Sequence, residues 1–336
     1  MKGKYTAVLL AAIMVFTMAS SVLAAPAEAA VKREGVPKVV RWGSATVGGA
    51  GYVIITAFSD TISKYVKDFR SSSMATSGGS ENVILIKDGT IDFGQLTSSD
   101  FVKAMLGEAP YNESIAVYQG IGYRTNANII HVLKKSGITS VEQLDGKKVA
   151  VGAASGSGRR MVQPGLLALG IKPEFVYGSW DECSEMLKSE QVAAVVYPIP
   201  GASMPTSAVL QLSSTSELSV VPLTQEQAQK MCEAAQGVSV VDVPADYLGT
   251  GSPAFFAQGY HNSLGVRPAV NEDVVYTVIK TLLEHQEELH TIAKDLALFS
   301  KENAFKYMLP EIPVHPGAAK YYKEIGIWDD RFTVGE

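Results

Sequence analysis

The segment KKVAVGAASGSGRRM, residues 147–161, joins a short apolar strand to a helix through a turn rich in glycine and serine. The strand is expected over residues 149–151, the turn over 152–158 and an amphipathic helix over 160–169. Glycine lets a ligand approach backbone N–H groups closely, and the first turn of a helix adds unpaired amides and the positive end of its dipole. The segment therefore predicts an α/β unit whose turn is suited to binding an anion.

The turn matches neither of the two common nucleotide motifs. It lacks the Gly-Lys-Ser/Thr ending of a P-loop, and Met161 stands where a dinucleotide fingerprint needs its third glycine. Arg159, a planar donor at the start of the expected helix, favours a small carboxylate as the anion. The alternative is that the glycines only form a tight turn.

The first thirty residues predict a secretory signal peptide. Lys2 and Lys4 precede an apolar run over about residues 5–18, and the small residues that follow offer cleavage after Ala24 or near Ala30. The alternative, an uncleaved membrane anchor, needs a longer apolar span. We therefore expect a periplasmic protein that does not span the membrane after cleavage.

Composition favours a two-domain protein and argues against several classes of ligand. Removing about thirty of the 336 residues leaves enough chain for two ordinary domains. The net charge of −5 gives no sign of nucleic-acid binding. Cys183 and Cys232 could pair or remain buried thiols, and they suggest no metal site together with five scattered histidines. No cofactor is expected.

Strands that end in small polar loops recur along the chain, which predicts an α/β fold. In the first part of the chain these loops cover residues 47–52, 77–80 and 97–100. Ligands of open parallel sheets sit at such carboxyl ends. Alternatives are a core position for Tyr52, and helix caps for Ser80 and Asp100. A stiff loop over residues 197–201 adds Tyr197 to the candidates. The predicted ligand-binding residues are Gly48, Gly49, Tyr52, Gly79, Ser80, Thr97, Ser98, Gly156, Ser157, Gly158, Arg159 and Tyr197.

The spacing of apolar residues along the chain predicts further strands and helices. Residues 114–122 and 127–133 predict two strands, the second of which crosses between lobes. Residues 272–300 predict one long helix, or two helices broken near residues 285–288.

Six motifs in this order resemble the TAXI family, the extracytoplasmic solute receptors of TRAP-type transporters. They are VGGAGY (47–52), SGGSEN (77–82), DFGQLTSSD (92–100), SVEQLDGKKVAVG (140–152), GSG (156–158) and PADY (244–247). The chain departs from the family pattern in two places: Tyr52 is a single aromatic where a pair is common, and the central turn is one residue longer with Arg159 in place of threonine.

The resemblance implies a two-lobed, periplasmic-binding-protein-like fold of type II with the ligand between the lobes. Lobe 1 would comprise residues 31–125 and 240–336, and lobe 2 residues 126–239, with hinge strands near 123–130 and 237–243. The solute would be a small organic anion, a dicarboxylate or an acidic amino acid such as glutamate. The partner would be a TRAP permease, and closure of the lobes would trap the solute.

Two other functions are alternatives. An enzyme on the same scaffold is disfavoured because the sequence contains no nucleophile elbow, metal cluster or Cys/His arrangement. A ligand-sensing protein for a signalling partner would be favoured by a fused transmembrane or kinase segment, and the sequence contains neither.

Overall fold

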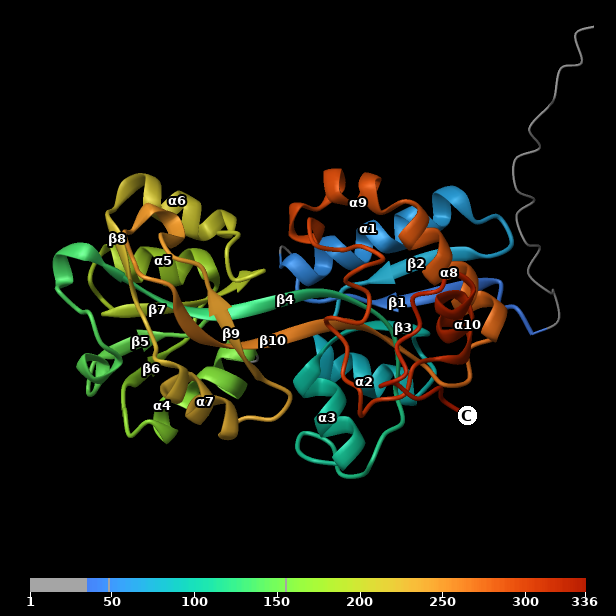
Figure 1. Ribbon diagram of the computed structural model, residues 1–336, viewed down its shortest axis with the longest axis horizontal. Helices are drawn as coiled ribbons and strands as arrows, with labels where there is room; N and C mark the ends of the chain where they lie inside the picture. Colours follow the sequence, from blue (N-terminus) through green and yellow to red (C-terminus); the bar gives the residue numbers. More distant parts are fainter. Residues whose placement is uncertain (1–34, 48, 155) are drawn as a thin grey trace, which may run out of the picture. The chain divides into compact units, whose positions relative to one another are not determined.

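A mixed β-sheet organises the chain, and helices cover both of its faces (Figure 1). The computed structural model describes residues 35–47, 49–154 and 156–336. The predicted signal peptide and Gly48 lie outside these residues. In the described part of the chain, ten strands form one sheet in the order β2-β1-β3-β10-β4-β7-β5-β6, while β8 pairs with β4 and β9 with β10. The predicted α/β class is confirmed.

The strands are parallel at both ends of the sheet and antiparallel in the middle, where β4 and β10 run side by side. Their bounds are β1 (Val39–Gly43), β2 (Arg70–Met74), β3 (Phe93–Thr97), β4 (Tyr118–Leu133), β5 (Lys148–Ala150), β6 (Glu174–Val176), β7 (Ala194–Pro200), β8 (Leu218–Val221), β9 (Ser239–Val243) and β10 (Phe255–Val266).

The helices follow most of the predicted amphipathic segments. They are α1 (Ala50–Tyr65), α2 (Gly79–Lys87), α3 (Ser98–Leu106), α4 (Gln163–Ala168), α5 (Trp180–Lys188), α6 (Ser207–Thr215), α7 (Gln225–Glu233), α8 (Glu272–Glu284), α9 (Gln286–Ile292) and α10 (Pro316–Glu324). Short helical turns are η1 (Lys134–Ser136), η2 (Val141–Leu144), η3 (Gly158–Val162), η4 (Tyr247–Gly249) and η5 (Lys294–Leu296). The predicted break near residues 285–288 is confirmed, because His285 separates α8 from α9.

The hydrophobic clusters divide between two sets of residues. Two clusters draw on residues up to Tyr123 and from Leu264 onward, while the other two draw on residues from Ala127 to Ala257. The strands β4 and β10 pass from one set to the other. Each set therefore packs around its own part of the common sheet.

Two separate strands were predicted for residues 114–122 and 127–133. This prediction was wrong, because residues 114–133 contribute a single long strand, β4. The polar residues in its middle are buried and bonded to the neighbouring strand instead of forming a loop. Asn126 Nδ2 donates to Asn262 Oδ1 over 2.6 Å, and Thr125 Oγ1 donates to the carbonyl of Tyr260 over 3.4 Å. Because the partner strand satisfies these groups, burial costs little and the strand continues.

The predicted hinge near residues 237–243 lies beside the strand that crosses between the two sets of clusters. That segment contains β9, which pairs with Phe255 to Gly259 of β10 as one arm of a hairpin. The strand that leads back is β10, whose last residues pair with both β3 and β4. The predicted crossing near residues 123–130 lies within β4.

The segment predicted as a stiff loop at residues 197–201 belongs to β7 as far as Pro200. The prolines are tolerated because β5 pairs with β7 at Ala194 and Val195, so the strand has a free edge beyond them. At a free edge, the missing N–H of proline leaves no neighbouring strand without a donor.

Candidate functional site

The three predicted loops of the first part of the chain meet at one edge of the sheet. The strands β1, β2 and β3 are parallel, so their carboxyl ends lie together, and α1, α2 and α3 begin there. This edge brings together Gly49 and Tyr52 at the start of α1, Gly79 and Ser80 at the start of α2, and Thr97 and Ser98 at the start of α3.

The first turns of α1 and α2 have no side-chain cap. Glycines occupy both N-cap positions, Gly49 for α1 and Gly78 for α2, and neither helix receives a capping hydrogen bond. The alternative of a helix cap for Ser80 does not hold, because Ser80 is the second residue of α2. In α1 the Tyr52 amide donates to the Gly49 carbonyl over 3.0 Å, so the first-turn amides left for another partner are those of Ala50 and Gly51, together with those at the start of α2.

The first turn of α3, by contrast, is closed by a capping box. Thr97 Oγ1 accepts from the Asp100 amide over 3.2 Å, while Asp100 Oδ2 accepts from the Thr97 amide over 2.9 Å and from Thr97 Oγ1 over 2.6 Å. The prediction that Asp100 helps to cap a helix is confirmed. Ser98 Oγ donates to the Gly237 carbonyl and accepts from the His261 amide. Thr97 and Ser98 thus bind the protein's own groups.

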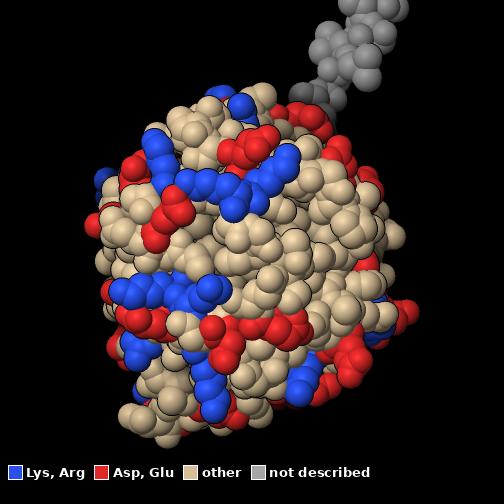
Figure 2. Space-filling model, turned by 90° about the vertical axis from the view of Figure 1, so that its left-hand side faces the viewer, with Lys and Arg blue, Asp and Glu red and all other residues tan. Residues whose placement is uncertain are grey.

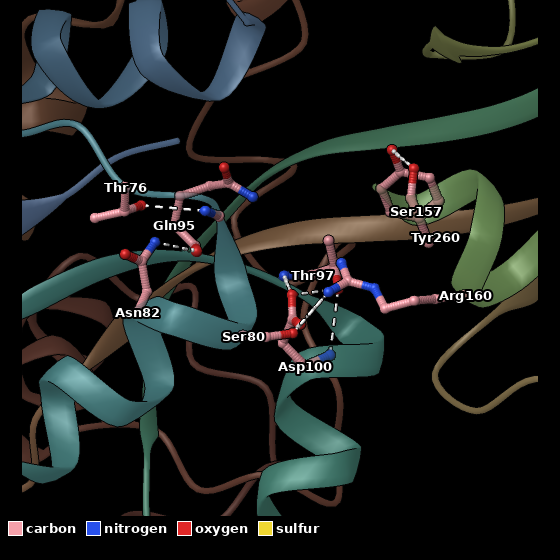
Figure 3. Close-up of polar contacts among 10 residues, drawn as sticks. Thr76, Ser80, Asn82, Gln95, Thr97, Asp100, Ser157, Arg160 and Tyr260 are labelled. Carbon is pink, nitrogen blue, oxygen red and sulfur yellow. Dashed lines mark hydrogen bonds and ion pairs between the residues drawn. The ribbon is translucent and has the colours of Figure 1, made fainter. Parts of the chain in front are cut away.

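Arg160 in η3 reaches the same edge from the other part of the sheet. Its Nη1 donates to Ser80 Oγ over 2.6 Å and lies 3.7 Å from Asp100 Oδ1 (Figure 3). Ser80 Oγ also donates to Asp100 Oδ1 over 3.1 Å. We call Ser80, Thr97, Asp100 and Arg160 the polar cluster. It joins α2 and α3 to η3.

Arg159, the arginine favoured from the sequence, is exposed and is not part of the polar cluster. Consecutive residues of a helical turn point in directions about 100° apart, so the two arginines cannot face the same group. The sequence alone gave no way to choose between them, because either could face the sheet edge.

The glycine-rich turn places its residues in two different settings. Ser157 Oγ lies 3.4 Å from the hydroxyl oxygen of Tyr260 in β10, next to half-buried Gly156 (Figure 3). Gly158 is buried, and a Cβ at this position would collide with the Val151 carbonyl. Gly158 is therefore required by the close approach of η3 to the end of β5.

Tyr197 is not at this edge. It is 1% exposed in the second set of clusters, and its hydroxyl lies 2.7 Å from Ser184 Oγ. Burial raises the pKa of Tyr197 to about 12. The structure thus places Tyr197 in a hydrophobic core, away from the other candidates.

Several buried polar residues at the edge were missed by the sequence analysis. Asn82 Nδ2 donates to the carbonyls of Gly43, Ser44 and Gln95, which ties α2 to the ends of β1 and β3. Thr76 and Gln95 lie beside it (Figure 3). The signal for Gln95 was its place in the strand DFGQLT, where a polar residue stands between apolar ones.

The charges of the polar cluster compensate each other. The side chain of Asp100 is 3% exposed and that of Arg160 is 24% exposed. Burial, together with the nearby charge of Asp100, raises the pKa of the Tyr111 hydroxyl well above its usual value. Burial lowers the pKa of His261 to about 4, with a smaller contribution from Lys306, so this ring is neutral at pH 7.

The described residues offer no alternative centre of metal or thiol chemistry. They contain no group of three or more His, Cys, Asp or Glu side chains placed to hold a metal ion. Cys183 and Cys232 are buried free thiols, and burial raises the pKa of both. Over the described ranges, no helix is both long and apolar enough to cross a membrane.

The surface charge is mixed in sign on the face seen in Figure 2. Lys and Arg side chains lie among Asp and Glu side chains there, and neither sign covers a continuous area. This face therefore has none of the continuous basic surface that nucleic-acid binding favours.

The chain belongs to the NMT1-like family, which matches residues 42–326. Among solved structures, XAC2383 from Xanthomonas citri bound to ATP aligns with 77% of this chain and 88% of its own, at a TM-score of 0.52 and 12% identity. XAC2383 bound to chloride ion aligns with 77% of this chain and 89% of its own, at 0.50 and 13%.

The periplasmic aliphatic sulphonate binding protein SsuA from Escherichia coli aligns with 78% of both chains, at a TM-score of 0.42 and 16% identity. At such identities these similarities concern the fold alone. The predicted fold class is confirmed by the mixed α/β sheet, whose fold XAC2383 shares.

Proposed function

We propose that this protein binds a small organic anion, a carboxylate, outside the cytoplasm and delivers it to a TRAP-type permease. The observation that carries this proposal is the pair of uncapped helix starts, α1 and α2, at the carboxyl ends of β1 and β2. Unpaired amides and the positive end of the helix dipole favour an anion at this position. Structures of XAC2383 hold ATP or chloride, so its fold accommodates anions.

The contacts of Arg160 narrow the set of donors that would hold the anion. Its guanidinium contacts Asp100 and Ser80, so its charge is largely compensated within the protein. The donors proposed for the solute are therefore the amides beside Gly49 and Gly79. Tyr52 is half-buried near the first of these, and Ser157 with exposed Arg159 would complete the site from the other side.

Closure around the solute is the proposed mechanism. The lobe boundaries predicted from the sequence follow residues 125 and 239. The hydrophobic clusters support the first and favour moving the second into β10, between Ala257 and Leu264. The two parts would rotate about β4 and β10, and a solute that contacts both parts would stabilise the closed form.

The permease and the compartment rest on the TAXI resemblance and on the predicted signal peptide. A binding role without catalysis is proposed because most groups of the polar cluster are paired with one another, which accounts for the cluster without a reaction.

Identification of the solute tests the proposal directly. The purified protein would be denatured and the released small molecule identified by mass spectrometry, then added back while thermal unfolding is followed. A ligand that binds only the native state raises the unfolding midpoint by mass action. Recovery of a small carboxylate that raises the midpoint is the expected result. Recovery of a neutral molecule, with no stabilisation by a panel of carboxylates, would contradict it.

A further inference from the structure

Gln95 in β3 has a buried side-chain amide without a protein partner. The residue is 7% exposed. Its backbone carbonyl accepts from Asn82 Nδ2, but among the described residues no group donates to its side-chain oxygen or accepts from its side-chain nitrogen. Figure 3 shows this amide extending away from Asn82. The Gln95 carboxamide is not among the fully buried, unpaired polar atoms of the described residues, which leaves it open to a ligand.

The amide lies against the first turn of α1. A Cβ added at Gly51 would collide with the Gln95 carboxamide, which shows how closely the two approach. Gly51 is the second residue of α1, and the N-cap of this helix, Gly49, supplies no side-chain acceptor. The Tyr52 amide donates to the Gly49 carbonyl, so the backbone amides that meet the Gln95 side chain at this place are those of Ala50 and Gly51.

The chemistry of these donors indicates one kind of group. The amides of Ala50 and Gly51 can donate. The Gln95 carboxamide, whose Oε1 lies nearest Gly51, can donate to the same acceptor through Nε2 after a flip of the amide. A carboxylate accepts several hydrogen bonds through its two oxygens and is favoured by the helix dipole. No acidic residue occupies the first turn of α1, so the protein itself supplies no such group there.

We propose that Gln95 is a solute-binding residue, which together with the first turn of α1 holds a carboxylate group of the solute. This inference rests on the proposed function and names the part of the site that would recognise the anion. Gly51 serves the same subsite, because any side chain there would displace the Gln95 amide. The polar cluster, in turn, has its own pairs and would position η3 opposite this subsite.

The test compares Gln95→Met with wild type by calorimetric titration of L-glutamate, L-glutamine and succinate. Methionine keeps the length of the side chain and removes its hydrogen bonds. We expect affinity for the carboxylate that binds wild type to fall about 10-fold or more, since a hydrogen bond to a charged group is lost. Gln95→Glu should weaken it further, because two carboxylates would face each other. Gln211→Met, an exposed position on α6, is the matched control and should bind like wild type.

Thermal unfolding of the solute-free variants separates binding from structure. Replacing an unpaired buried amide with an apolar group should leave the midpoint unchanged or raise it. If Gln95→Met binds within twofold of wild type, or if its solute-free midpoint falls by several degrees, the inference is overturned while the proposed function stands. If none of the three solutes binds wild type, the carboxylate proposal and the inference fail together.

Discussion

The helices α1 and α3 begin at the same edge of the sheet but differ in how their first turns are satisfied. Thr97 and Asp100 close the start of α3 with three hydrogen bonds, and Arg160 lies next to the Asp100 carboxylate. The start of α1 has a glycine at the N-cap and the free Gln95 amide beside it. The difference supports the proposed division of roles, in which α3 fixes the scaffold and the start of α1 binds the solute.

Removing Asp100 should have the largest effect on the free energy of unfolding, because it disrupts the capping box at the start of α3. Asp100→Ala breaks the capping box and leaves Arg160 without its buried partner, so we expect the free energy of unfolding to fall by about 3 kcal/mol. Urea unfolding would measure this. Glu113→Ala is the control, because Glu113 pairs with Lys87 on the surface and should contribute less than about 1 kcal/mol. A loss below 1 kcal/mol for Asp100→Ala would contradict the scaffold role of α3.

Acidification should separate fold stability from the α1 subsite. Burial lowers the pKa of His131 to about 4, below the ordinary 6.5. Between these two values the unfolded chain binds a proton that the folded protein does not, so the free energy of unfolding falls as the pH falls through this window. For His131 alone we expect about 2 kcal/mol between pH 7 and pH 5.

Two further measurements complete this pH test. His131→Phe should reduce the slope of stability against pH, since it removes the buried ring that titrates. Carboxylate binding would be measured by calorimetry at pH 7 and at pH 5, at a temperature below the unfolding midpoint. The affinity should differ by less than about twofold, because His131 belongs to the core around Tyr247 and not to α1. A tenfold loss of affinity at pH 5 would show that the two regions are coupled.

Giving α1 a cap should turn it into a helix start like that of α3. Gly49→Asp places an acceptor and a negative charge at the N-cap, where the backbone is already extended with φ −81° and ψ 155°. Stability should rise by only a few tenths of a kcal/mol relative to glycine, whereas carboxylate affinity should fall about 10-fold through competition and repulsion. Gly49→Ala is the control without an acceptor. Unchanged affinity in Gly49→Asp would contradict the proposed difference between the starts of α1 and α3.

Thr97→Val should have the smallest effect. It removes the side-chain acceptor of the α3 cap while keeping its shape, so we expect a loss of about 1 kcal/mol in the free energy of unfolding. Solute affinity should remain within about twofold of wild type, since Thr97 donates to Asp100. An affinity loss that exceeds the stability loss would return Thr97 to the list of ligand-binding residues.

The sequence was informative where local chemistry determines the outcome. Gly49, Gly79 and the turn around Gly156 were found because glycine and serine after an apolar strand predict a strand-to-helix turn. The role of Asp100 followed from its place at the start of an expected helix, where aspartate favours a cap, although its partner Thr97 was predicted to bind the ligand. These features depend on neighbours within a few positions, so a single sequence contains them.

The sequence was uninformative where distant segments determine the outcome. The choice between Arg159 and Arg160 depends on how η3 is rotated against the sheet, and Gly158 fixes that rotation by its contact with Val151. The prolines of β7 are acceptable because β5 ends early. Likewise, the polar middle of β4 became a strand because β10 pairs with it.

The division of the hydrophobic clusters has a consequence for the order of folding. The residues from Ala127 to Ala257 supply two clusters that are complete before the last eighty or so residues are synthesised. The cluster around Val40 and Trp42, however, also needs side chains as late as Phe332. Since domains fold as their residues emerge from the ribosome, we expect the interior segment to fold first. The first residues of the described chain would complete their hydrophobic cluster only after the last residues have been synthesised.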